Sequence, residues 1–196
     1  QKGLIIYRQH YSEDHPQLKW VLAYLGNTYR ILGDAKQAKL VLEQALQNYK
    51  SIPSNKAEYA RTVAYLGITY KDLGDYKKSV QFLKNALHIH TTHFSSAHPD
   101  MVWILGYLGD SYRKLEDYKN AEYVLEKGLA IHNQYYSHNA SEKNWFMFLL
   151  GKVYRELGKY QKARTFLEAS LVYHREHFGK EHLETAHPHP NPPPLS

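Results

Sequence analysis

Thirteen histidines are the residues of this 196-residue chain that most suggest chemistry. Two groups lie close together in sequence, namely His88, His90 and His93, and His174 with His177. His10, His93 and His177, however, occupy equivalent places in successive segments, and each precedes an aromatic residue. A metal site needs ligands that converge on one point, whereas equivalent places along an array are spread out. We therefore interpret these histidines as structural or solvated and predict no metal site.

Other catalytic and binding chemistry finds no support in the residue types. The absence of cysteine excludes disulfides, thiolate metal sites and a cysteine nucleophile. No Ser-His-Asp order, phosphate-binding glycine loop or paired acidic motif stands in a suitable context. We expect no catalytic residue, no cofactor and no small-molecule substrate, and we do not expect an enzyme.

Composition narrows the class of protein further. With 43% hydrophobic residues the chain can fold, and it has neither an apolar span of membrane length nor a secretory segment. We expect no membrane association and a cytoplasmic location. The net charge of +6 favours acidic partners only weakly.

The glycines reveal an internal repeat. Gly26, Gly67, Gly109 and Gly151 are separated by 41, 42 and 42 residues. Three places later comes a tyrosine in every copy, and six places later a leucine. The small residues Ala38, Ser79, Ala121 and Ala163 and then Ala45, Ala86, Gly128 and Ser170 follow in the same register, with Leu42, Leu83, Leu125 and Leu167 between them.

Each repeat is predicted to form two helices. Apolar residues recur at helical spacing in both halves of the repeat. Gly33, Gly74 and Gly158 stand where a left-handed C-terminal cap belongs, and Asp34, Asp75 and Asp117 follow as N-caps. The predicted pairs are 17–32 with 35–50, 57–73 with 76–94, 99–115 with 118–136, and 141–157 with 160–178. A glycine repeated inside the first helix indicates close approach of a neighbouring helix, into which large residues such as Leu42 would fit.

The order Leu-Gly, Tyr, Gly-Asp-Tyr, Ala, Ala resembles the tetratricopeptide repeat. The 42-residue period, with His15-Pro16 and His98-Pro99, is similar to the kinesin light chain type of this repeat. The resemblance implies an all-α fold, a right-handed α–α superhelix or solenoid. It also implies a non-enzymatic scaffold that holds a partner peptide in a concave groove lined by the first helices.

The repeat register divides the chain. Residues 15–182 are expected to hold four repeats, 15–55, 56–97, 98–139 and 140–181. Residues 1–14 align with the end of a second helix, so we expect them to finish a preceding repeat. Residues 183–196 are rich in proline, which cannot continue a helix, and are expected to be irregular. A ligand for a proline-binding module is an alternative interpretation of this tail.

The first helices carry a second face, about 150° from the leucine-tyrosine stripe at roughly 100° per residue. We therefore expect this face to lie apart from the core. Its rows read Trp20, Ala23, Asn27 and Arg30; Arg61, Ala64, Ile68 and Lys71; Trp103, Gly106, Asp110 and Arg113; and Trp145, Phe148, Lys152 and Arg155. The predicted groove residues are Trp20, Asn27, Arg30, Arg61, Lys71, Trp103, Arg113, Trp145, Phe148, Lys152 and Arg155.

Each half of this pattern has a structural alternative. The cation that ends every row also stabilises the last turn of a helix. The tryptophans could instead pack against an adjacent repeat. If both kinds of residue face the groove, they suit an acidic peptide with hydrophobic anchors.

Two other functions compete with a peptide scaffold. The array could be a regulatory or sensor segment of a larger signalling or nucleotide-binding switch protein. Nucleic-acid binding is less favoured, because Asp72, Asp110 and Glu156 interrupt the basic residues, whereas nucleic-acid binders present a stripe of one sign.

Overall fold

The computed structural model describes residues 16–47, 49, 56–94 and 98–178, and all its regular elements in these ranges are α-helices. They are α2 (Pro16–Ile31), α3 (Ala35–Gln47), α4 (Lys56–Asp72), α5 (Tyr76–His93), α6 (Pro99–Lys114), α7 (Tyr118–Tyr135), α8 (Ala140–Glu156) and α9 (Tyr160–Phe178). Every predicted span agrees with its helix to within three residues at either end. The interpretations of residues 1–14 and 183–196 lie outside the described residues. Within those described, no helix is long and apolar enough to cross a membrane.

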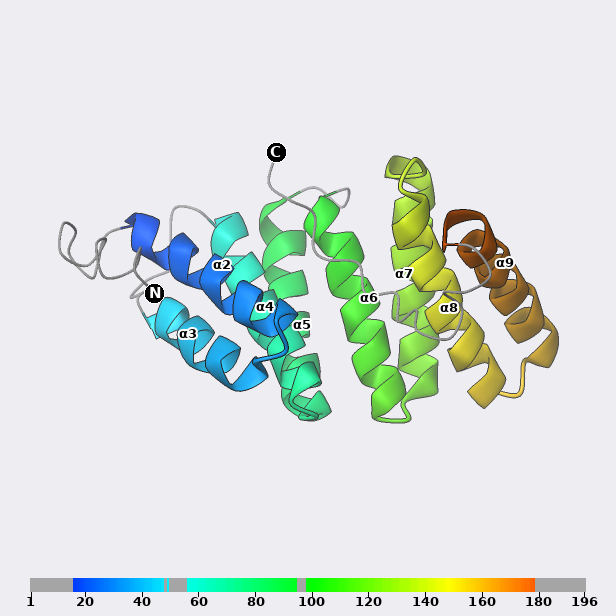
Figure 1. Cartoon of the computed structure of the whole chain (residues 1–196), viewed down its shortest axis with the longest axis horizontal. Helices are drawn as coiled ribbons and strands as arrows, with labels where there is room; N and C mark the ends of the chain where they lie inside the picture. Colours follow the sequence, from blue (N-terminus) through cyan, green and yellow to red (C-terminus); the bar gives the residue numbers. More distant parts are fainter. Residues whose placement is uncertain (1–15, 48, 50–55, 95–97, 179–196) are drawn as a thin grey trace. The chain divides into compact units, whose positions relative to one another are not determined.

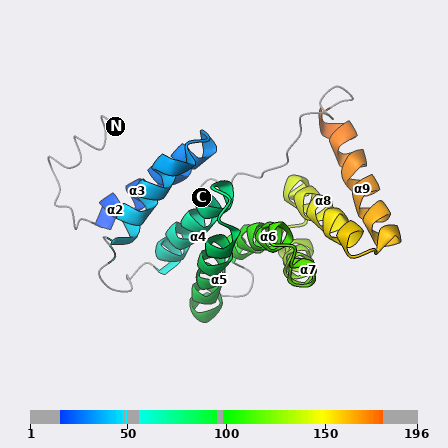
Figure 2. The same ribbon diagram turned by 90° about the horizontal axis from the view of Figure 1, so that it is seen from below.

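The chain divides into two compact units, residues 1–93 and 94–196. In the first unit, α2 packs against α3 and α4, α3 against α4, and α4 against α5. In the second unit, α6 packs against α7 and α8, α7 against α8, and α8 against α9. The described part of each unit therefore holds two helical hairpins, in which consecutive helices lie side by side (Figure 1, Figure 2). First helices contact each other as well as their own second helices.

The turn inside each hairpin is fixed by its sequence. Gly33, Gly74 and Gly158 have positive φ angles of 84°, 82° and 72°, as predicted for C-terminal caps. The third repeat places Glu116 there at φ 61°, a conformation that is uncommon for residues with a Cβ atom. The predicted N-caps are also confirmed, because Asp34, Asp75 and Asp117 accept hydrogen bonds from the backbone N–H groups three residues later.

The repeated mid-helix glycines set how closely the two helices of a hairpin approach. A Cβ atom added to any of them would lie less than 3.0 Å from a leucine side chain of the following helix. The pairs are Gly26 with Leu42, Gly67 with Leu83, Gly109 with Leu125, and Gly151 with Leu167. The predicted packing of large residues into the space left by glycine is therefore confirmed.

Tyrosines of the first helices join neighbouring hairpins. The Tyr70 hydroxyl of α4 donates to the Glu43 carboxylate of α3 over 3.0 Å. The Tyr154 hydroxyl of α8 makes the equivalent bond to Glu126 of α7 over 2.7 Å. Burial, together with the negative carboxylate that accepts the hydrogen bond, raises the pKa of Tyr70 to about 12 and that of Tyr154 further. Both hydroxyls therefore remain protonated donors at neutral pH.

Candidate interaction surface on the first helices

The face of the first helices that we predicted to lie apart from the core is largely buried. Ala23, Ala64, Ile68, Trp103 and Trp145 are at most 2% exposed, and Asn27 and Asp110 are nearly as well covered. The prediction of a separate face is wrong at these places, because consecutive first helices pack against each other within each unit. A helix in an array has neighbours on two sides, which the angle around a single helix does not reveal. The exposed residues of the face are Trp20 and Arg155, whereas the side chains of Arg30, Lys71 and Arg113 are at most 15% exposed.

Trp145 shows how this packing works in the second unit. Its indole lies over Gly106 of α6, where an added Cβ atom would overlap the ring. The same indole meets the Tyr107 ring edge-to-face, with centroids 4.9 Å apart. Trp145 therefore packs between α8 and α6. This supports the alternative interpretation of the tryptophans, in which they pack against an adjacent repeat.

The other members of the tryptophan column differ in their surroundings. Trp103 is 1% exposed, and its indole N–H donates to Asp100 over 3.1 Å. Arg61 replaces tryptophan in the second repeat, where its guanidinium donates to the Tyr24 hydroxyl over 3.0 Å and to Glu58 over 3.2 Å. Trp20 is 43% exposed and touches Tyr24 edge-to-face. Of the three tryptophans, Trp20 alone presents a large surface to solvent.

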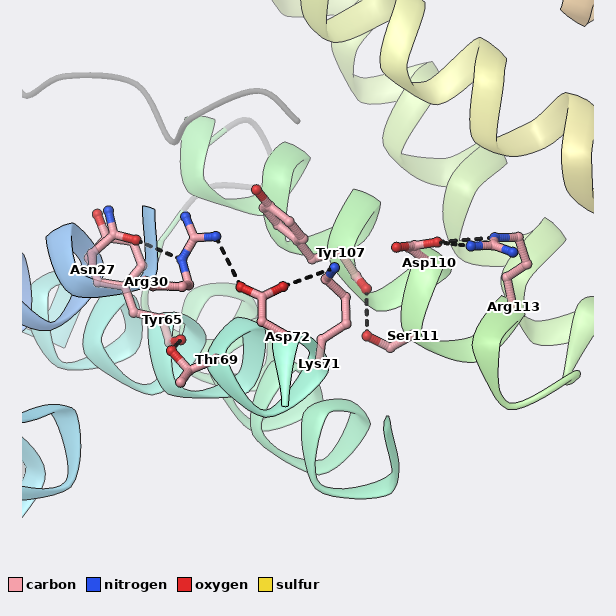
Figure 3. Close-up of polar contacts among 10 residues, drawn as sticks. All are labelled: Asn27, Arg30, Tyr65, Thr69, Lys71, Asp72, Tyr107, Asp110, Ser111 and Arg113. Atoms are coloured by element: carbon pink, nitrogen blue, oxygen red, sulfur yellow. Dashed lines mark hydrogen bonds and ion pairs between the residues drawn. The ribbon is translucent and has the colours of Figure 1, made fainter. Parts of the chain in front are cut away.

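In the first unit an aspartate neutralises the cationic end of the face. Asp72 lies 3.3 Å from the Arg30 guanidinium and 3.2 Å from the Lys71 ammonium (Figure 3). Arg30 also donates to the Asn27 side-chain oxygen over 3.0 Å (Figure 3). The two cations of this unit are thus held by side chains of their own and the neighbouring first helix.

In the second unit the corresponding cations are less well balanced. Arg113 binds Asp110 through its Nε and Nη2 atoms at 3.0 and 2.6 Å (Figure 3). Arg155 pairs with Glu156 at 2.6 Å, but its side chain remains 62% exposed. Lys152 has neither an ion pair nor a hydrogen bond within the described part of the chain. Its ammonium lies over the Phe148 ring, 4.9 Å from the ring centroid.

Lys152 is the cation with the least favourable surroundings in the second unit. Partial burial lowers its pKa, and the positive charges of Arg113, Lys114 and Arg155 lower the pKa further. Asp110 opposes this effect, but that carboxylate is already bonded to Arg113. An anion placed here would gain several charges at once and would relieve repulsion among the cations. The charges around Lys152 therefore favour an anion such as a carboxylate, and the Phe148 ring lies beside the ammonium.

The cations of this face were predicted from the sequence, but which of them form ion pairs with acidic residues was not. Asp110 stands in the column of Asn27, Ile68 and Lys152, so this column is neutral in the first two repeats, negative in the third and positive in the fourth. Asp72 stands five places after Gly67, in the column that also holds Glu156. Part of the signal was present in the sequence, because a carboxylate three residues from a cation on a helix, such as Asp110 before Arg113, can reach it.

The described helices form hairpins that repeat about every 42 residues, which defines a helical repeat solenoid. Three models of the tetratricopeptide repeat match the chain, over residues 23–51, 59–134 and 149–184. Together these matches span more than half of the chain, which belongs to the tetratricopeptide repeat family. No curated protein matches it in sequence.

Solved structures resemble the chain in fold. A kinesin light chain candidate from Podosopora anserina, with nearly identical TPR-like repeats, has a TM-score of 0.72 at 18% identity and covers 89% of this chain and 83% of its own. BtubC (BKLC) from P. vanneervenii has a TM-score of 0.74 at 19% identity, and the match covers 96% of this chain and 72% of BtubC. MamA has a TM-score of 0.61 at 17% identity, and the match covers 87% of this chain and 84% of MamA.

These findings confirm the predicted fold class, an all-α tetratricopeptide repeat superhelix, and its fold is similar to that of kinesin light chain-like repeats. Tetratricopeptide repeats generally serve as non-catalytic scaffolds for protein interaction, and the chain is a scaffold in this general sense.

Proposed function

We propose that the second unit binds an acidic peptide along the first-helix face formed by α6 and α8. The observation that carries this proposal is Lys152, a half-buried ammonium without an anionic partner among the described residues, with three other cations nearby. Arg113, which bonds Asp110, and Arg155, which pairs with Glu156 but is 62% exposed, would add positive charge around the peptide. Phe148 would receive a hydrophobic side chain of the peptide. The scaffold itself needs no cofactor, metal or small-molecule substrate for this task.

The first unit would contribute less to binding an anion. Arg30 and Lys71 already share Asp72, so a peptide carboxylate would have to compete with an existing partner. Trp20 is the exception, because its exposed indole could hold an apolar anchor. Arg61 and Asn27 are bonded within the unit, and we assign them a supporting part only.

Peptide binding can be tested with three fluorescein-labelled probes in fluorescence anisotropy. The first is an extended peptide with two glutamates flanking a leucine, the second is its glutamine counterpart, and the third is a short DNA duplex. We expect only the acidic peptide to bind, and binding to weaken as NaCl rises, because screening reduces contacts between charges.

Variants then locate the site. Combining Arg113→Gln with Lys152→Gln should weaken the acidic peptide about tenfold or more, since each charged hydrogen bond contributes roughly 1.5–3 kcal/mol. Lys127→Gln, an exposed cation on α7, serves as the matched control and should bind like the parent. Equal affinity for the glutamine peptide, or binding of DNA alone, would exclude this function. In that case the regulatory-segment and nucleic-acid alternatives would take precedence. A cytoplasmic location stays a prediction.

A further inference from the structure

A buried histidine and a buried glutamate meet where the third hairpin joins the fourth. His132 lies in the last turn of α7 and is 0% exposed. Glu142 lies in the first turn of α8 and is 9% exposed. The His132 Nε2 atom is 3.8 Å from a Glu142 carboxylate oxygen, too far for a hydrogen bond. The peptide-binding proposal does not use this pair.

The hydrogen bonds of the two side chains indicate which forms they take. His132 Nε2 lies 2.9 Å from the carbonyl oxygen of Asn139, and because a carbonyl only accepts, Nε2 carries the proton. His132 Nδ1 is buried without a hydrogen-bond partner, as a neutral ring allows. The Glu142 carboxylate accepts no hydrogen bond from any of the described residues. These surroundings favour the neutral form of both side chains, a neutral imidazole and a protonated carboxyl group, because burying an unsatisfied charge is costly.

The equivalent carboxylates of earlier repeats are satisfied differently. Glu58, Asp100 and Glu142 stand 42 residues apart. Glu58 pairs with Arg61 at 3.2 Å, and Asp100 accepts the Trp103 indole N–H at 3.1 Å. Among the described residues no bond joins Glu142 to Trp145, its neighbour at the same spacing. Glu142 is thus the member of this column that lacks a compensating donor.

The remaining charged and titratable groups around the pair do not supply that donor. Burial is the cause that raises the pKa of Glu142, to about 7. Burial lowers the pKa of His132, and the charges of Lys143 and His138 lower it further, while Asn139 and Asn133 oppose the shift. Tyr136, in the connecting turn, feels the charges of Glu142 and of Asp100 on α6. On the α9 side, Asn144 contacts His174 over 3.2 Å.

We propose that the contact of His132 and Glu142 makes the junction of α7 and α8 a pH-responsive joint. While Glu142 keeps its proton, the first turn of α8 packs against α7. When Glu142 loses the proton, a carboxylate remains without a donor in that contact, and the start of α8 loosens. The joint would alter the position of α8, which carries Phe148 and Lys152, but its existence does not depend on peptide binding.

The direction of the pH effect follows from the two shifts. A raised pKa means that the folded protein holds the Glu142 proton more tightly than the unfolded chain, so stability falls as pH rises from about 4.5 through about 7. A lowered pKa of His132 has the opposite effect, which still continues at pH 6.5, where the unfolded histidine is half protonated, and is nearly complete about one pH unit higher. Between pH 6.5 and 8.5 the difference between the parent and a variant that lacks the Glu142 carboxyl therefore isolates the effect of Glu142.

The test uses Glu142→Gln, which keeps the shape of the side chain but cannot ionise. Urea midpoints are measured between pH 6.5 and 8.5 for the parent, for this variant and for Glu176→Gln, an exposed glutamate of α9 that serves as control. The parent and Glu176→Gln should lose stability with rising pH, and Glu142→Gln should lose less. Parallel curves for all three proteins would overturn the proposal.

Local measurements keep the test decisive even if other groups also titrate. Carboxyl-carbon NMR should show Glu142 titrating near pH 7, whereas a midpoint near 4.5 would refute the joint. Hydrogen exchange, corrected for the intrinsic effect of pH, should show residues 140–145 losing protection at pH 8.5 relative to pH 6.5. This loss should be absent in Glu142→Gln, and its persistence there would also count against the joint.

Discussion

The first-helix face of the first unit and that of the second unit have the same sequence register but different environments. In the first unit, Asp72 lies between Arg30 and Lys71 and neutralises both. In the second unit, Asp110 is bonded to Arg113, and Lys152 is left with an aromatic ring as its contact. The position of one aspartate therefore decides which cations remain available, and a column of like residues is not by itself a binding site.

The tryptophan column shows the same dependence on neighbours. Trp145 fills the space above Gly106. In the first unit Arg61 stands at the position equivalent to Trp145, and Ala23 stands at the position equivalent to Gly106. Trp20 remains 43% exposed. A residue of one type can thus be core in one unit and surface in the other, and the following predictions test that difference.

The largest effect is expected from removing the buried indole. Trp145→Ala should lower the free energy of unfolding by about 3–5 kcal/mol, as large-to-small changes in cores do. Trp20→Ala is the matched variant in the first unit and should change it by only about 1 kcal/mol, because 43% of this residue is exposed. Urea unfolding followed by circular dichroism measures both. Similar losses for the two variants would show that exposure does not separate these sites.

A smaller effect is expected at the glycine beneath that indole. Gly106→Ala would place a Cβ atom inside the Trp145 ring and should cost about 1–3 kcal/mol through overpacking. Ala23→Gly, the reciprocal change in the first unit, should cost only about 1 kcal/mol, the ordinary difference in helix propensity. If Gly106→Ala were neutral or stabilising in thermal unfolding, the close approach of α8 to α6 would be refuted.

The fold could be predicted from the sequence because its determinants are local and repeated. Glycine and aspartate fix each turn, and the period of 42 residues aligns four copies of the same pattern. Glu116 was the exception in the cap column, and the structure places it at a positive φ because the hairpin geometry is imposed by its neighbours.

The candidate site could be predicted only in part. Helical angles gave the face but not the burial of Trp103 and Trp145, since burial depends on the next helix in the array. Ion pairs between helices, such as Arg30 with Asp72, depend on how far apart two first helices lie. The carboxylates at Glu58, Asp100 and Glu142 were visible at a spacing of 42, but their different partners could be assigned only from the structure.

The smallest expected effect distinguishes the two units by its sign. Lys71→Met removes an ammonium bonded to Asp72 and should lower the free energy of unfolding by about 0.2–1 kcal/mol, as the loss of an ion pair near the surface does. Lys152→Met removes an ammonium whose pKa is lowered by burial and by neighbouring cations, and it keeps an apolar stem against Phe148. It should therefore raise stability, by no more than about 0.5 kcal/mol after screening by solvent. Urea midpoints at pH 7 in low salt give both signs, and the difference between the variants should shrink as NaCl is added, because screening weakens attraction and repulsion alike. A loss of stability in Lys152→Met equal to that in Lys71→Met would mean that Lys152 is as well compensated as Lys71, and the asymmetry between the two faces would disappear.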